Sequence, residues 1–259
     1  GALLALVIFA VSVIAYQELT AASKVRGDGQ VPSAPVIAGC VMILVYYAVL
    51  GLALGRDIGA VFPAMVLVIA AALLVFLFVY VFTFPKYHAN QIMAALFCFL
   101  YGPVMLSFLY LLREGFEDGI YLVWFVFLAS WGSDTCAYCV GVLIGKHKMT
   151  PKLSPKKSIE GAVGGVLGAA LLFVLYTHFV INEYTMMTLP LPLAACLGAV
   201  GALVSMVGDL AASAVKRDHD IKDYGKLIPG HGGIMDRFDS VIVAAPIVFW
   251  GIALAVGFV

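Results

Sequence analysis

Charged residues are scarce in this sequence. Only 12% of its 259 residues are Asp, Glu, Lys or Arg, whereas a soluble domain averages about 25%. Hydrophobic residues make up 63% of the chain, and the mean hydropathy is +1.06. Long polar stretches are also lacking, because apolar runs such as AMVLVIAAALLVFLFVYVF follow one another with short loops between them. This composition excludes a soluble globular protein and predicts an integral membrane protein.

Three further absences narrow the class. The formal net charge is zero, so the whole molecule offers no electrostatic reason to bind nucleic acid. The alternating apolar and polar pattern of a membrane β-barrel is absent, which favours helices that satisfy their own backbone hydrogen bonds. The five cysteines lie in apolar runs, and no second Cys or His pair accompanies Cys136 and Cys139 to complete a four-ligand zinc site. We expect these cysteines to be packing residues.

The apolar runs predict an all-α, polytopic bundle with about eight transmembrane helices. A helix needs about 20 apolar residues to cross the hydrocarbon core of a bilayer. The candidate spans are residues 2–20, 34–54, 59–84, 91–112, 119–145, 161–181, 190–215 and 238–258.

The basic residues predict the orientation of these spans. Cytoplasmic loops of membrane proteins are enriched in Lys and Arg. Of the fifteen basic residues, only Arg56 and Arg113 fall outside one set of alternate loops, so we expect that set to be cytoplasmic. The first span would then begin outside, and because the sequence does not begin with Met, we expect a further N-terminal helix or a cleaved signal peptide before it. The predicted cytoplasmic set comprises Lys24, Arg26, Lys86, Lys146, Lys148, Lys152, Lys156, Lys157, Lys216, Arg217, Lys222, Lys226 and Arg237.

Two acidic residues lie inside predicted spans, where ionisable side chains are costly and mark functional positions. They are Asp134, in LASWGSDTCAYCVG, and Asp209, in SMVGDLAASAVKR. Neither has a basic residue within four positions of its own helix, so we expect each carboxylate to face a bundle interior, a wet cavity or a cation. For Asp134, a hydrogen bond to the backbone or to a nearby serine is the alternative. Glu18, near the end of the first span, is left without an assigned role.

Much of the remaining charge lies in one stretch, KRDHDIKDYGKLIPGHGGIMDRFD, at residues 216–239. Asp236 and Asp239 are three residues apart at the start of the last span, so they share a helix face. We expect them to converge with Asp209 at the ends of two neighbouring helices, where oxygen ligands suit Mg²⁺. A cluster of internal salt bridges with Lys and Arg is the alternative. Asp209 also begins a polar helix face, which continues through Ser213, Lys216 and Arg217.

A glycine-rich turn separates the predicted carboxylate positions. Pro229 and the neighbouring glycines of PGHGG interrupt the helix and allow close approach of the backbone to a ligand. Backbone N–H groups at such a turn bind phosphate well, and basic side chains add cationic donors. Carboxylates for a metal and cations for phosphates together indicate phosphoryl or nucleotidyl transfer. A second basic loop, SPKKSIEG, carries Lys156 and Lys157, for which a role in topology alone is the alternative.

Three motifs resemble those of the phosphatidate cytidylyltransferases, also called CDP-diacylglycerol synthases. The main one is Ser213-Ala-Val-Lys216-Arg217, four residues, Lys222-Asp223, then PGHGG and Asp236-Arg-Phe-Asp. SWGSDTCAY and SPKKSIEG resemble two further motifs in the expected order, and the similarity covers roughly residues 120–245. The family more often has Thr and an aromatic residue where this chain has Ser158 and Ile159, which weakens any specific role for those two positions.

The resemblance implies transfer of the cytidylyl group of CTP to phosphatidate, with release of pyrophosphate. It also implies Mg²⁺, with room for a second cation, and a homodimer. The short polytopic chain without extra domains indicates a bacterial inner membrane, and the basic loops place the active site on the cytoplasmic side. Residues 1–115 would form N-terminal transmembrane helices, and residues 116–259 the catalytic transmembrane region. The resemblance and the residue patterns together assign three sets of site residues. The metal ligands are Asp209, Asp236, Asp239 and Asp134. The catalytic residues are Lys216, Arg217, Lys222, Asp223, His231 and Arg237, and the substrate-binding residues are Lys156, Lys157, Ser213, Gly232 and Gly233. His231 as a simple turn residue is the alternative to its catalytic role.

Two other functions remain to be weighed. A CDP-alcohol phosphotransferase also gathers aspartates at a membrane interface, but the chain lacks the aspartate spacing of that class. An ion-coupled transporter would spread its charges across membrane depth and break a helix near the midplane. The charges here gather at one predicted face instead.

Overall fold

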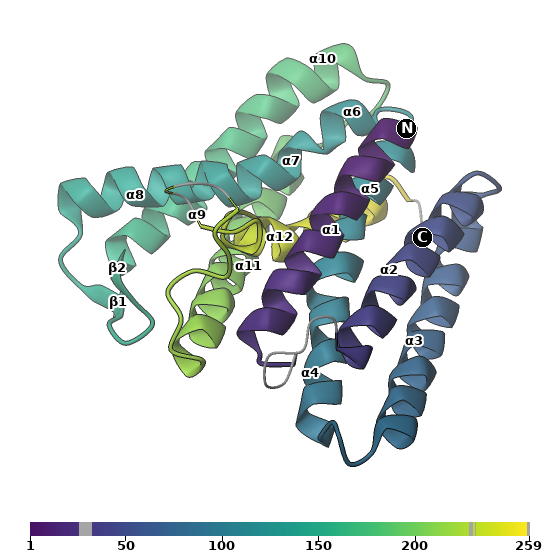
Figure 1. Cartoon of the computed structure of the whole chain (residues 1–259). Coiled ribbons are helices and arrows are strands. Elements are labelled where there is room, and N and C mark those ends of the chain that lie inside the picture. The colour runs from purple at the N-terminus through teal and green to yellow at the C-terminus, as the bar shows by residue number, and fades with distance from the viewer. Residues whose placement is uncertain (26–32, 228–229, 231, 258–259) are drawn as a thin grey trace. The chain divides into compact units, whose positions relative to one another are not determined.

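The computed structural model describes residues 1–25, 33–227, 230 and 232–257, and these residues are predominantly helical (Figure 1). Eight helical stretches in this part of the chain are long and apolar enough to cross a membrane. The predictions of a polytopic helical membrane protein and of about eight spans are therefore confirmed. The stretches are Leu3–Ala22, Ala34–Leu54, Ile58–Thr83, Ala89–Glu114, Gly119–Ile144, Ile159–Tyr184, Leu191–Asp218 and Met235–Ala255.

Several stretches are built from more than one helical segment. The first four contain α1 (Ala2–Ala22), α2 (Ala34–Leu54), η1 (Ile58–Ala60), α3 (Val61–Thr83), α4 (Ala89–Phe99), η2 (Leu100–Val104) and α5 (Met105–Glu114). The last four contain α6 (Gly119–Leu122), α7 (Trp124–Phe127), η3 (Leu128–Gly132), α8 (Ser133–Ile144), α9 (Ile159–Tyr176), η4 (Thr177–Ile181), α10 (Asn182–Tyr184), α11 (Leu191–Asp218) and α12 (Met235–Ala255).

The chain divides into two compact units, which are described separately. The first unit comprises Gly1–Tyr110 and Asp218–Asp236, and the second comprises Leu111–Arg217 and Arg237–Val259. The polar stretch between α11 and α12 thus belongs mostly to the unit of the N-terminal helices. The assignment of separate functional roles to residues 1–115 and 116–259 stays a prediction.

Buried hydroxyl groups join the helices of the first unit. Ser12 of α1 and Tyr47 of α2 share a hydrogen bond of 2.7 Å, and the Tyr47 hydroxyl donates to the carbonyl of Pro103 at 3.1 Å. Tyr46 and Ser107 are joined at 2.9 Å. Such bonds stabilise helix association where lipid offers no competing water.

Glycines bring the helices of the second unit close together. The α8 and α9 helices lie side by side (Figure 1), and a Cβ at Gly161 would lie 2.7 Å from the carbonyl oxygen of Ala137. A Cβ at Gly208 of α11 would lie 2.9 Å from the carbonyl oxygen of Asp239 on α12. Small residues at these crossings allow backbones to approach closely, as is common in membrane bundles.

A short antiparallel hairpin interrupts the helical architecture in the loop before α9. It pairs β1 (Lys148–Thr150) with β2 (Ser154–Ser158). The hydroxyl of Ser158 then accepts a 3.1 Å hydrogen bond from the N–H of Gly161 and caps the start of α9. The sequence indicated this segment only as a basic loop, and the hairpin fixes the backbone that carries its lysines.

Candidate functional site

The second unit contains a pocket of about 500 Å³ that combines lysines with aspartates. Residues of α8, the β1–β2 hairpin, α9 and α11 line it. Its charged residues are Lys148, Lys156, Lys157, Asp134 and Asp209. Both acids of the predicted spans therefore line a cavity, which is one of the three surroundings expected for them, and SPKKSIEG supplies cations to the same cavity.

An ion pair connects two of the predicted motifs inside this pocket. The Lys157 Nζ lies 2.5 Å from Oδ2 of Asp209, and less than a third of either side chain is exposed. One turn further along α11, the Ser213 hydroxyl donates to Oδ1 of Asp209 at 3.5 Å. The helix face predicted for Asp209 and Ser213 is therefore present, and the side chain of Lys157 faces Asp209 rather than open solvent.

A π-helical turn precedes the helix that carries Asp134. This turn, η3, holds its Ser130 hydroxyl against the carbonyl of Val126 at 2.7 Å, and Thr135 bonds the carbonyl of Trp131 at 2.8 Å. A π-helical turn changes the register of the residues that follow it and is frequent at functional sites. Asp134 lies in the first turn of α8, directly after this π-helical turn, and lines the pocket.

A third carboxylate of the second unit, that of Asp239 on α12, is buried, with only 9% of the residue exposed. It interacts electrostatically with Asp209, Asp134 and Lys216, and its Oδ1 accepts the N–H of Ser240 at 2.7 Å. Like charges gathered away from water require a cation nearby. Lys157 supplies one such cation through its ion pair with Asp209.

The donor chemistry of these carboxylates fits Mg²⁺. Among the residues that the structure describes, no three His, Cys, Asp or Glu side chains form a ready-made metal cluster. Protein-bound Mg²⁺ typically uses one or two carboxylates and completes its shell with water and substrate phosphates, so a preformed cage is not required. Asp209 and Asp239, with Asp134 near them, supply such oxygens.

The fourth predicted metal ligand, Asp236, lies in the first unit and is held by backbone groups. Its Oδ2 accepts the N–H of Tyr224 at 2.8 Å and the N–H of Gly233 at 3.0 Å. Asp236 and Asp239 both lie in the first two turns of α12, as predicted. Their convergence with Asp209 on one metal stays a prediction.

The glycine-rich turn differs in one respect from the prediction. Gly230 and Gly232 have φ of +76° and +84°, a backbone region that L side chains rarely adopt, which explains the glycines. The N–H of Gly233, however, donates to Asp236 and does not point to an open phosphate position. The neighbouring N–H groups of Ile234 and Met235 donate to Glu18.

Glu18 contacts the residues that follow this turn, and the sequence left it without an assigned role. It belongs to α1 and is separated from Ile234 by 216 positions. Its carboxylate is the one formal charge among the side chains of α1, which was the available signal, but the sequence does not indicate its partner.

Glu160 is a second residue without a predicted role. Its carboxylate accepts the N–H of Lys146 at 3.1 Å and the N–H of His147 at 3.2 Å, and lies 2.6 Å from the His147 ring nitrogen. These contacts join the start of α9 to the residues before β1, and so close the base of the hairpin.

The remaining predicted residues are distributed along the polar stretch. Lys222 and Asp223 are exposed in the loop, Lys216 is half-buried near the end of α11, and Arg217 and Arg237 are exposed. The indole N–H of Trp131 donates to the carbonyl of Arg237 at 3.4 Å. His231 and Pro229 lie outside the described residues. The individual roles of these side chains stay predictions.

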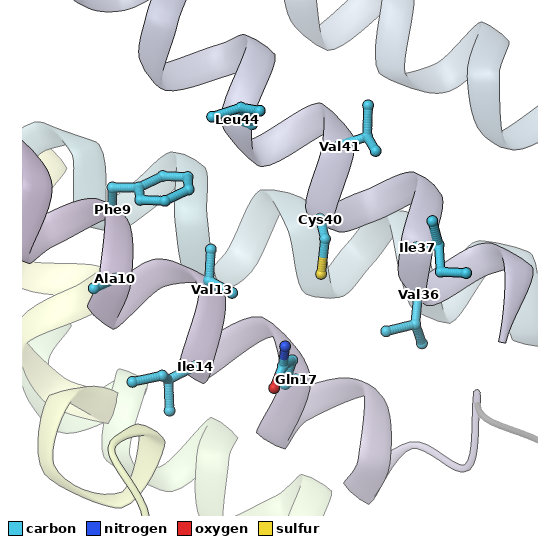
Figure 2. A pocket seen from close by; sticks show the side chains of 10 residues that line it. All are labelled: Phe9, Ala10, Val13, Ile14, Gln17, Val36, Ile37, Cys40, Val41 and Leu44. Carbon is cyan, nitrogen blue, oxygen red and sulfur yellow. The ribbon is translucent and has the colours of Figure 1, made fainter. Parts of the chain in front are cut away.

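An apolar groove of about 700 Å³ lies between α1 and α2 in the first unit (Figure 2). Its lining is aliphatic and aromatic apart from Gln17 and Cys40. It offers no ionic group for phosphate chemistry, and the pocket of the second unit is therefore the candidate active site.

The fold and the pocket define a polytopic helical membrane protein with lysines and carboxylates suited to a phosphate-bearing ligand. The family described as "Cytidylyltransferase family" matches residues 1–255. The chain belongs to the cytidylyltransferase family, and the resemblance noted in its motifs is confirmed.

Several relatives share one name, phosphatidate cytidylyltransferase. The protein of Staphylococcus saprophyticus is 33% identical over 156 residues, which are 60% of this chain and 58% of the relative. That of Mycobacterium bovis is 37% identical over 161 residues, covering 62% and 50%, respectively. That of Synechocystis sp. is 39% identical over 141 residues, covering 54% and 46%. The chain spans about half the length of the curated relatives it matches.

Proposed function

We propose that the chain transfers the cytidylyl group of CTP to phosphatidate, which gives CDP-diacylglycerol and pyrophosphate. The observation that carries the proposal is the Lys157–Asp209 ion pair in a pocket that also holds Lys156 and Asp134. Family membership and the shared name of the relatives support the same reaction. Other membrane lipid-phosphate transferases and ion-coupled transporters are not favoured.

The reaction joins a membrane substrate to a water-soluble one. A phosphate oxygen of phosphatidate attacks the α-phosphorus of CTP, the bond between that phosphorus and the oxygen bridging to the β-phosphate breaks, and pyrophosphate leaves. Phosphatidate is already an anionic nucleophile, so a strong general base is unnecessary. The enzyme therefore acts mainly by positioning the two phosphates and by stabilising the negative charge that develops between them.

The lysines of the hairpin supply that stabilisation. Lys156 is exposed at the pocket, and Lys157 faces inward on the same strand. The triphosphate of CTP competes with the Asp209 carboxylate for the Lys157 ammonium. Transfer of this ammonium from Asp209 to a phosphate would couple substrate binding to the release of a carboxylate.

Mg²⁺ is the cofactor that the proposed reaction requires, and a second cation would occupy the same region. When bound, Mg²⁺ neutralises phosphate charge and aligns the reacting oxygens. Asp209 and Asp239 would hold it, with Asp134 and Asp236 as further predicted ligands. Ser213, Lys216 and Arg217 would orient and neutralise phosphates near the end of α11. Lys222 is a further predicted catalytic cation, which Asp223 would orient.

The proposed location is a bacterial inner membrane with the pocket facing the cytoplasm, where CTP is available. The alternation of basic loops supports this orientation. We also propose that the protein acts as a homodimer with phosphatidate and CTP as its partners.

Identification of the lipid product tests the reaction class. Purified protein in mixed micelles is incubated with CTP, phosphatidate and Mg²⁺, and the lipids are analysed by mass spectrometry. We expect a new lipid heavier than phosphatidate by the mass of a cytidylyl group. CMP release from added CDP-diacylglycerol and an alcohol, without cytidylyl transfer from CTP, would instead indicate a CDP-alcohol phosphotransferase.

A further inference from the structure

We propose that Glu18 is a positioning residue, which fixes the start of α12 and thereby the carboxylate of Asp236. This inference rests on the proposed function for its effect on catalysis, but its structural part concerns only contacts within the first unit. Glu18 does not itself touch a reacting atom in this account.

Both carboxylate oxygens of Glu18 bind the first turn of α12. Oε1 accepts the N–H of Ile234 at 3.1 Å, and Oε2 accepts the N–H of Met235 at 2.8 Å. The first N–H groups of a helix have no partner within the helix, and a negative charge is favourable at that end of the helix dipole. A side chain of α1 thus caps the start of α12.

Two glycines leave space for this carboxylate. A Cβ at Gly233 would overlap both oxygens of Glu18, and a Cβ at Gly225 would lie 2.8 Å from its Cδ. Gly225 comes before the glycine-rich turn and Gly233 ends it, so the carboxylate is enclosed by both limbs of the loop. Space of this kind at two separate positions indicates that the loop is shaped around Glu18.

The same turn orients Asp236. The N–H of Gly233 donates to Asp236 Oδ2, and the next two N–H groups along the chain donate to Glu18. The N–H of the buried Tyr224 also donates to Oδ2 of Asp236. Two carboxylates therefore share three consecutive backbone donors, and loss of one carboxylate leaves the beginning of α12 free to shift.

The position of Glu18 in the membrane supports a function for its charge. It is the one ionisable acidic or basic side chain of α1, whose other residues are apolar, small or neutral. An acid in such a helix is costly unless its partners compensate, and an apolar or neutral residue would fill the same space at lower cost.

The test compares Glu18→Gln with Glu117→Gln, a matched loss of charge in an exposed loop. Two quantities are measured on folded protein in detergent: hydrogen exchange of peptides covering residues 232–238, and kcat and KM for CTP and for phosphatidate. In Glu18→Gln we expect faster exchange in this segment and a fall in kcat of about 10- to 100-fold, the range seen when partners that orient metal ligands are removed. KM values should change much less, and Glu117→Gln should match the wild type in both measurements.

A second variant protects the test against a simple folding defect. Gly225→Ala leaves Glu18 in place but crowds its carboxylate, so it should reproduce the faster exchange and the lower kcat. Glu18→Asp keeps the charge on a shorter side chain, so it should restore part of the protection of this segment against hydrogen exchange.

Unchanged exchange in Glu18→Gln would overturn the inference, whether or not activity falls. Faster exchange with normal kcat would overturn the link to Asp236. If the wild type shows no cytidylyl transfer while Glu18→Gln still exchanges faster, the proposed function fails and the anchoring of the turn stands.

Discussion

Lys157, at the end of a short hairpin, forms a 2.5 Å ion pair with Asp209, in the second half of the long helix α11. Two sequence motifs separated by about fifty positions meet in this pair. It places a cation for phosphate next to a carboxylate for a metal, which is the combination that transfer of a nucleotidyl group requires.

Replacement of Lys157 should weaken substrate binding. Lys157→Ala removes a charge-assisted contact to phosphate, worth about 1.5–3 kcal/mol, so KM for CTP or phosphatidate should rise about 10- to 100-fold with a smaller change in kcat. Lys152→Ala, in the exposed turn of the same hairpin, is the matched control and should leave KM unchanged. An unchanged KM in Lys157→Ala would assign this lysine to membrane topology alone.

The ion pair between Lys157 and Asp209 should contribute to the thermal stability of the protein. Lys157→Met and Asp209→Asn each leave one partner uncompensated in a half-buried place, so each should lower the midpoint of thermal unfolding in detergent. The double variant should lose less than the sum of the two, with a coupling of about 0.5–3 kcal/mol. Strict additivity would show that the two side chains do not interact in the folded protein.

Loss of Glu160 should loosen the hairpin that carries the lysines. Glu160→Gln weakens the contacts to Lys146 and His147, and we expect KM for CTP to rise severalfold while kcat stays close to that of the wild type. Glu183→Gln, on an exposed part of α10, serves as the control. A fall in kcat with normal KM would place Glu160 in the chemical step and contradict a purely positioning role.

The two aspartates at the start of α12 should both be essential. Asp236→Asn and Asp239→Asn each remove a predicted metal carboxylate, so turnover should fall about 100-fold or more with the protein still folded. Raised Mg²⁺ should restore part of the loss if the defect lies in metal affinity. Near-normal turnover of Asp236→Asn at saturating Mg²⁺ would contradict its assignment as a ligand.

The spans could be predicted because hydropathy in a membrane depends on local composition, and a run such as residues 59–84 has no alternative fold in lipid. The lysines of SPKKSIEG and the acid of α11 could also be selected as candidates from their charge, and the structure places them in one pocket. Their pairing was not, because it depends on the tertiary approach of the hairpin to the helix. Helix periodicity carries no information about contacts between segments far apart in the sequence.

The contacts of Glu18 illustrate the same limit. A lone acid in α1 signals a function, but its partners are backbone N–H groups more than 200 positions away. Every residue except proline has a backbone N–H group, so the residue types in the sequence do not show which N–H groups bind Glu18. The role predicted for Gly233 in substrate binding stays a prediction, and the structure adds that its N–H donates to the carboxylate of Asp236.

The most direct test of the account is pyrophosphate release by the purified protein in micelles, with CTP, phosphatidate and Mg²⁺ each omitted in turn. We expect release only when all three are present, and loss of that release in Asp209→Asn but not in Glu117→Gln. Absence of release from folded wild-type protein in the complete mixture, or release that persists without phosphatidate, would contradict this expectation.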